Sequence, residues 1–176
     1  MTNGVEAQHA VLHILVVGTE AWAIDRAERA LQHAGHEVVR CPAAGRPGQE
    51  CGVLDGTACD LDHRLDVVLS VRAHPLAHVV RSEYGAVCAL RRGVPLVLAG
   101  SGASSPFACF ASAVLDLDGD VVGACVQAAA STRVEPAKAT LDELELLVRG
   151  GLQTLDAPRR QYLAHPVPMR RDHVTR

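Results

Sequence analysis

A glycine- and serine-rich segment in the second half of the chain has the residue types that hold anions. It reads GSGASSP and ends at Pro106. Glycines let the backbone approach a ligand, serine hydroxyls donate hydrogen bonds, and proline suits the first position of a helix, whose amino end attracts negative charge. The candidate ligand-binding residues are Gly100, Ser101, Gly102, Ser104 and Ser105. The segment lacks the lysine of a phosphate-binding loop and the GxGxxG spacing, so a loop that only caps a helix is the alternative.

Three cysteines and one histidine of a single stretch have side chains that bind soft metals. They are Cys41, Cys51, Cys59 and His63, and the stretch from Pro42 to His63 is rich in Gly, Pro and Asp and has no periodicity. Thiolates and imidazoles are the usual ligands of structural zinc, which would clamp such a surface loop. Because no CxxC pair is present, zinc, a redox disulfide between Cys51 and Cys59, and unpaired thiols all stay open.

Trp22 is the single tryptophan of the chain and lies one helical turn before Arg26. An exposed tryptophan beside an arginine suits stacking on a ligand or a partner surface. Partial burial under the loop from Cys41 to His63 is the structural alternative.

The elements that must position these residues begin with a strand over His13–Val17 that ends at Gly18. The apolar period then changes from two to 3.6 residues, which predicts a helix with Thr19 as its cap, Glu20 in its first turn and Gly35 just past its end. The apolar stripe of this helix consists of Ile24, Ala27, Leu31 and Ala34.

Three more short strands are predicted, with helices between them. The strands are a segment at residues 36–41, Asp66–Val71 and Val94–Ala99. A helix is expected over Glu83–Arg92 with Ser82 as its cap, and a fifth strand in either Phe107–Leu117 or Val121–Ala130. A capping box at Thr140–Glu143 opens a last helix.

Alternating strands and helices in this order predict an α/β fold with right-handed crossovers. We expect a single flavodoxin-like or Rossmann-like three-layer domain over residues 11–156, with a five-stranded parallel sheet of order 2-1-3-4-5. Residues 1–10 form a flexible N-terminus and residues 157–176 a basic tail. Ligands of such sheets bind at the carboxyl ends of the strands, so Gly18–Trp22, Ser70–His74 and Gly100–Ser105 should converge there. Ser70 and Arg72 therefore join the candidate ligand-binding residues.

Composition restricts the partners of the chain. It has 176 residues, a net charge of −3 and only 3% aromatic residues, which argues against a duplex-binding or base-stacking surface. Only the arginine-rich tail could contact nucleic acid. We expect a cytoplasmic protein with no membrane contact, because no apolar run is long enough to span a bilayer. Exposed helix surfaces can support a homodimer, and Cys88 and Cys125 are predicted to be core residues.

Three segments resemble parts of response-regulator receiver domains. The opening of those domains, with its first strand and first helix, is similar to HILVVGTEAWAIDRAERALQHAGHEVV, and their central strand is similar to DVVLSVRAHP. Their lysine and final helix are similar to Lys138 and the following ATLDELELLVRGG. The chain departs from that family where phosphorylation would take place. It keeps only Glu20 of the expected acid pair, and Ser70 or Val71 stands where the acceptor aspartate would be. Phosphoryl transfer of this kind needs a carboxylate nucleophile and acids that hold Mg²⁺. The resemblance therefore implies a non-catalytic regulatory or ligand-binding module, with a small anionic or nucleotide-like ligand.

Ser-Glu-Tyr-Gly, followed by Gly93 and Pro95, is similar to the E-x-G pattern of nucleoside deoxyribosyltransferase-like enzymes. That resemblance implies Glu83 as a nucleophile at the anomeric carbon of a nucleoside or nucleotide sugar. A first-turn glutamate stabilised by the helix dipole is the structural alternative, and a thiol or metal sensor built on the Cys41–His63 loop is a third hypothesis.

Overall fold

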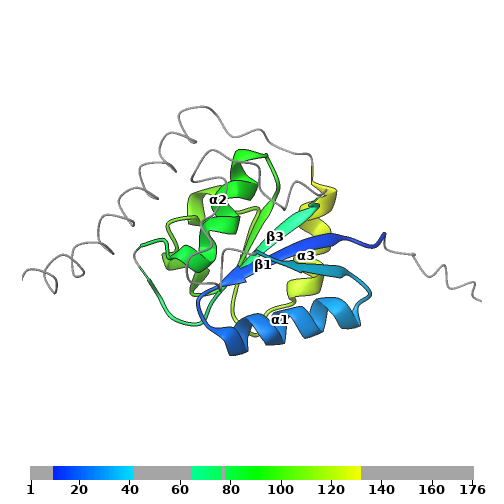
Figure 1. The fold of residues 1–176 in the computed structure, drawn as a ribbon, viewed down its shortest axis with the longest axis horizontal. Coiled ribbons are helices and arrows are strands. Elements are labelled where there is room, and N and C mark those ends of the chain that lie inside the picture. Colours follow the sequence, from blue (N-terminus) through cyan, green and yellow to red (C-terminus); the bar gives the residue numbers. More distant parts are fainter. Residues whose placement is uncertain (1–9, 42–64, 77, 132–176) are drawn as a thin grey trace, which may run out of the picture.

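The computed structural model describes residues 10–41, 65–76 and 78–131. Strands and helices alternate along these residues (Figure 1). The strands are β1 His13–Gly18, β2 Glu37–Arg40, β3 Val67–Arg72, β4 Leu96–Gly100 and β5 Ala113–Leu115. The helices are α1 Ala21–His33, α2 Tyr84–Arg91 and α3 Val121–Ala130. Short 3₁₀ turns occupy Arg81–Glu83, Ser101–Ser104 and Ala108–Phe110.

The five strands form one parallel sheet in the order β2-β1-β3-β4-β5. This confirms the predicted single α/β three-layer domain and its strand order. From β1 the chain crosses to β2 on one side, whereas from β3 it crosses to β4 on the other side. The connections that follow these two neighbouring strands therefore lie on opposite faces of the sheet. In such sheets the point between these two strand ends is where ligands are expected to bind.

Alternate residues of the strands supply two separate apolar layers. On one face Leu15 and Val17 of β1 pack with residues of α2. On the other face Ile14 and Val16 pack with residues of α1 and α3. Figure 1 shows the result, with α2 on one side of the sheet and α1 and α3 on the other. Because both faces are covered, the central strands are almost entirely apolar, as is typical of parallel sheets.

Glycine ends both α1 and α2 by the same mechanism. Gly35 has a φ of 85° and Gly93 a φ of 65°, a left-handed conformation that suits the residue after a helix. The amide of His36 donates to the carbonyl of Leu31, and that of Val94 donates to the carbonyl of Ala89. Gly35 was predicted in this role, but Ala34 is the exposed C-cap residue instead of a member of the apolar stripe.

The predicted strands lie within two residues of their observed positions, but two predicted helix caps are wrong. Glu20, not Thr19, is the N-cap residue of α1, so it does not belong to the first turn. Glu83, not Ser82, is the N-cap residue of α2 because a 3₁₀ turn precedes that helix. Of the two candidates for the fifth strand, the first contains β5 and the second forms α3.

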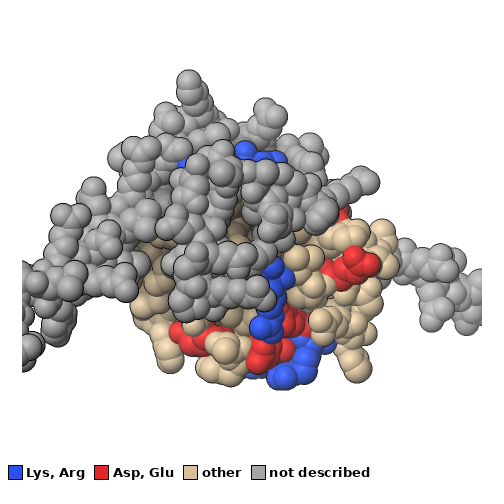
Figure 2. All heavy atoms as spheres, viewed as in Figure 1, with Lys and Arg blue, Asp and Glu red and all other residues tan. Residues whose placement is uncertain are grey.

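Several predictions fall on residues that the structure does not describe. They concern the loop over residues 42–64, the helix opened by Thr140–Glu143, the N-terminus and the tail over residues 157–176. Among the described residues, no helix combines the length and apolar character needed to cross a membrane. Figure 2 shows basic and acidic side chains next to each other on the side where α1 lies, which agrees with the ion pairs of Arg40 with Asp25 and Glu28.

Candidate functional site

The carboxyl ends of β1, β3 and β4 lie side by side, as the topology predicted. Gly18 is in register with Val71, and Arg72 is in register with Gly100. The amide of Thr19 donates to the carbonyl oxygen of Val71 across 3.3 Å. The segments Gly18–Trp22, Ser70–His74 and Gly100–Ser105 therefore begin at one edge of the sheet. Whether they bind a ligand there stays a prediction.

Glu20 connects two of these loops. One of its carboxylate oxygens accepts a hydrogen bond of 3.0 Å from the amide of Ala73 and a second from the hydroxyl of Thr19. The hydroxyl of Ser101 donates to the carbonyl of Ala73 across 3.4 Å. Ala73 is thus held from both neighbouring strand ends, and Glu20 joins the loop after β1 to the loop after β3.

Arg72, the last residue of β3, forms a buried ion pair with Glu83. Its Nε donates to Oε1 of Glu83 at 2.5 Å and its Nη2 donates to Oε2 at 2.6 Å. The side chains are 1% and 0% exposed. Two further guanidinium donors, on Nη1 and Nη2, reach the carbonyls of Leu76 and His78. One side chain therefore fixes both the start of α2 and the loop that leads to it.

Both carboxylate oxygens of Glu83 are occupied within the protein. Besides the two bonds from Arg72, Oε2 accepts from the amide of Val80 at 3.2 Å and Oε1 lies 3.5 Å from the hydroxyl of Ser70. A nucleophile must reach its substrate with a free lone pair. The arrangement gives Glu83 a structural role that fixes the loop after β3.

The glycine within α2 has a packing explanation. A Cβ on Gly85 would lie 2.8 Å from Cγ1 of Val17 and 3.0 Å from Cδ2 of Leu15. Close packing of α2 on β1 therefore requires glycine at this position, with no contribution from a ligand.

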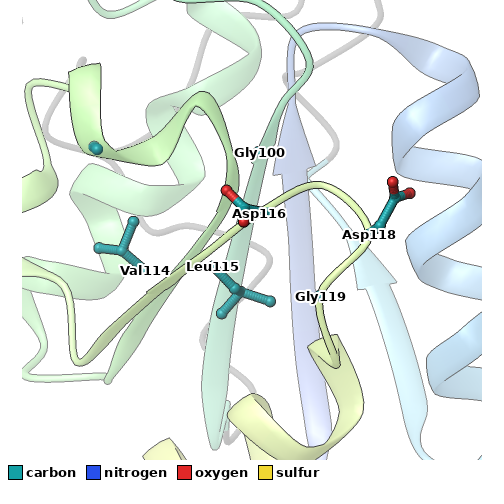
Figure 3. Close-up of a pocket in the computed structure, with 7 residues that line it drawn as sticks. Gly100, Val114, Leu115, Asp116, Asp118 and Gly119 are labelled. Carbon is teal, nitrogen blue, oxygen red and sulfur yellow. The ribbon is translucent and has the colours of Figure 1, made fainter.

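A hollow of about 540 Å³ lies at the ends of β4 and β5. Figure 3 draws its lining residues, with the side chain of Asp118 pointing toward α1 and that of Asp116 close to Gly100. The full lining is Gly100, Ala103, Val114, Leu115, Asp116, Asp118 and Gly119. The two aspartates were missed in the sequence. Their signal was the alternation of acids with apolar residues and glycine in LDLDGD, directly after a strand candidate.

The GSGASSP segment does not lead into an α-helix, so the predicted role of Pro106 at a helix start is wrong. Ser101–Ser104 is a 3₁₀ turn, and the hydroxyl of the buried Ser105 accepts from the amide of Phe107 at 3.2 Å. Gly102 is buried, and a Cβ there would lie 2.6 Å from that of Leu98. Packing and turn formation thus explain Gly102 and Ser105, while Ser104 stays exposed.

Trp22 is 53% exposed in the first turn of α1. One turn later, Arg26 pairs with Asp118 at 2.7 Å. The guanidinium is therefore directed toward the hollow at the β4 and β5 ends. An exposed indole beside this pair leaves the predicted role of Trp22 in a ligand or partner contact open.

The predicted zinc ligands are only partly within the described residues. Cys41 is buried at the end of β2, whereas Cys51, Cys59 and His63 lie outside the described residues. In the part of the chain that the structure describes, no group of three or more His, Cys, Asp or Glu side chains could hold a metal ion.

Cys88 and Cys125 are core residues, as predicted. Burial, with a smaller contribution from the charge of Asp120, raises the pKa of Cys125 to about 12. Its thiol is consequently unreactive near neutral pH, because the thiolate is the nucleophile. Cys109 is a free and exposed thiol.

The comparisons with known proteins add no family to this description. No protein-family model matches the chain, and no curated protein is significantly similar to it in sequence.

Proposed function

We propose that this chain is a non-catalytic regulatory or ligand-binding α/β module, receiver-like in shape, whose binding surface is the carboxyl edge of the sheet. The observation that supports it best is the state of the acids at this edge. Glu83 is enclosed by Arg72 and Glu20 is bonded to the amide of Ala73. The two carboxylates to which the sequence resemblances gave a chemical role are therefore engaged in holding the loops in place.

The end of β3 gives further support. Ser70 is 1% exposed and its neighbour Val71 is also 1% exposed, so neither presents a group to a phosphodonor. A receiver-type reaction requires an accessible carboxylate at this point of the strand. A module with this edge transmits the presence of a ligand or partner without forming a phosphoaspartate.

The exposed groups near the edge indicate the chemistry of the ligand. Ser104 and the carboxylates of Asp116 and Asp118 are accessible, and Trp22 offers an aromatic face. The charge of Asp118 is compensated by Arg26, but the carboxylate of Asp116 repels anions and an indole face attracts cations. The described part of the edge therefore favours a neutral or cationic small molecule over the anionic or nucleotide-like ligand expected from the sequence.

Intact-mass measurement after incubation with Mg²⁺ and a small phosphodonor such as acetyl phosphate tests the non-catalytic part of the proposal. We expect no added phosphoryl group. Phosphorylation at Ser70 or Glu20, located by fragmentation, would overturn it.

Amide chemical shifts of the full chain, recorded against a panel of small cationic, neutral and anionic molecules, test the binding surface. We expect changes at Ala73, Ser101–Ser104 and Asp116–Gly119, with the amide of Glu37 at the opposite edge as the internal control. Changes confined to residues away from the carboxyl edge would contradict the proposal.

The two other hypotheses from the sequence have separate tests. A catalytic Glu83 predicts that Glu83→Gln loses nucleoside-cleaving activity while keeping its stability, whereas the buried pair predicts a loss of stability. Native mass spectrometry of protein purified without chelator would show zinc if the Cys41–His63 loop binds it.

A further inference from the structure

A histidine at the amino edge of the sheet lies between two carboxylates from its two neighbouring strands. His13 is the first residue of β1. Its Nε2 is 3.0 Å from Oε2 of Glu37, the first residue of β2, and its Nδ1 is 3.3 Å from Oδ2 of Asp66, which immediately precedes β3. The backbone joins the same groups, because the amide of His13 donates to Oδ2 of Asp66 at 2.9 Å and the amide of Asp66 donates to the carbonyl of His13 at 3.0 Å.

The two contacts of the ring require a specific protonation state. A carboxylate only accepts hydrogen bonds, so each ring nitrogen must donate. A neutral imidazole carries one donor and one acceptor, and only the imidazolium form carries two donors. With a neutral ring, one nitrogen lone pair would face a carboxylate oxygen in either tautomer. Both contacts of His13 are therefore satisfied at once only when the ring is protonated.

We propose that His13, Glu37 and Asp66 form a proton-dependent clamp that holds β2 and the start of β3 to β1. Loss of the proton removes one of the two ring contacts and loosens the amino end of β2. Imidazole is the side chain that ordinarily changes its charge between about pH 5 and pH 8. Because one ring contact of the folded protein is lost together with the proton, the stabilisation by the clamp decreases as the pH rises.

The nearby charged and titratable groups do not provide the same proton-dependent contact between β1 and β2. His36 precedes β2 and is buried, and its Nδ1 accepts from the amide of Leu12 at 3.4 Å. That bond needs an unprotonated Nδ1, which is the opposite requirement. Arg40, at the other end of β2, is directed toward Asp25 and Glu28 of α1.

The size of the clamp's effect on stability follows from the solvent exposure of its three side chains. The side chains of His13, Glu37 and Asp66 are 43%, 66% and 26% exposed, so solvent screens both contacts. Each exposed pair of this kind changes the unfolding constant by only about 1.5- to fivefold. The clamp therefore adjusts the attachment of an edge strand without deciding whether the domain folds.

Denaturant unfolding of the full chain at about pH 5.5 and about pH 8 tests the clamp. We expect the unfolding constant of the wild type to rise roughly 1.5- to fivefold more between these values than that of His13→Gln, which has no titrating ring. His74→Gln is the matched control, because His74 is exposed and follows the carboxyl end of β3. It should keep the difference seen in the wild type.

An unchanged pH difference in His13→Gln would overturn the proposal, and so would its loss in His74→Gln. If His13→Gln does not fold, Glu37→Gln removes one partner at an exposed position and should reduce the difference by about half. Nitrogen chemical shifts of the His13 ring give a direct reading. A neutral ring at about pH 5.5 in the folded protein would contradict the clamp.

Discussion

The two edges of the sheet carry charged clusters that differ mainly in their access to water. At the carboxyl edge Arg72 and Glu83 are 1% and 0% exposed, and each nitrogen of the guanidinium and each oxygen of the carboxylate has at least one partner in the protein. At the amino edge the ring of His13 meets Glu37 and Asp66 while all three side chains stay in contact with solvent.

Access to water decides whether each charged cluster keeps a single state or responds to its surroundings. Removing one partner of a buried pair leaves an uncompensated charge in a low-dielectric interior, so the pair is fixed in one state. A solvent-exposed cluster gains little from its contacts and can lose a proton at small cost. The enclosed pair is therefore suited to fixing the loop beside the candidate site, and the open cluster to responding to pH.

The largest effect is expected from breaking the enclosed pair. Glu83→Gln keeps the shape of the side chain but leaves the charge of Arg72 uncompensated, and we expect a loss of about 3 to 5 kcal/mol in the free energy of unfolding. Denaturant titration measures it. The double variant Arg72→Met with Glu83→Leu should lose less than Glu83→Gln alone, because no charge stays buried. Wild-type stability of Glu83→Gln would show that the pair does not have the structural role given to it here.

Next in size is the effect of adding a methyl group at Gly100, between the ends of β3 and β4. Its φ is 86°, and a Cβ would lie 2.0 Å from the carbonyl oxygen of Arg72. We expect Gly100→Ala to lose about 3 kcal/mol from strain and overlap with backbone. Gly93→Ala is the control, because its φ is also positive but an added Cβ would meet no atom of the described residues within 4 Å, its chain neighbours apart, and it should lose only about 1 kcal/mol. Equal losses in the two variants would contradict close packing at the carboxyl edge.

A smaller effect is expected at the bridge between the loops after β1 and β3. Glu20→Ala removes the acceptor for the amide of Ala73 and should cost about 1 kcal/mol. Hydrogen exchange of the Ala73 amide should become faster. Glu20→Gln retains an acceptor oxygen and serves as the control, with slower exchange than Glu20→Ala. Identical exchange in both variants would show that the carboxylate does not hold this loop.

The smallest effect is expected from an exposed pair at the same edge. Asp118→Asn removes the charge that faces Arg26, but the two side chains are 82% and 52% exposed. We expect a change within about 0.5 kcal/mol that disappears in high salt, measured by thermal unfolding at two ionic strengths. A loss as large as that of Glu83→Gln would remove the contrast between enclosed and open pairs.

Much of the architecture was predictable because local patterns and the overall fold agree. Apolar runs such as VVLSV indicate strands covered on both faces, and the change of period after Gly18 indicates α1. Gly35 marked the end of that helix. The exceptions were local: Thr19 and Ser82 are residue types that favour caps, but loops fixed from elsewhere in the fold placed the helix starts at the next residue.

The candidate site was predictable only as a location. Topology brought together the segments after β1, β3 and β4, whereas the state of their side chains depended on contacts distant in sequence. Glu83 carries no mark in the sequence of its pair with Arg72, 11 residues away. An arginine at the end of an apolar strand was the available signal for a buried charge that needs a partner.

By itself the sequence determined the layers, the order of elements and the edge of the sheet where the loops meet, because these follow from hydrophobic periodicity and the handedness of crossovers. Only the tertiary structure decided which charges are enclosed and which stay in water. The physical reason is that the energy of a charge depends on its surroundings in three dimensions, and those are supplied by strands and loops that are far apart along the chain.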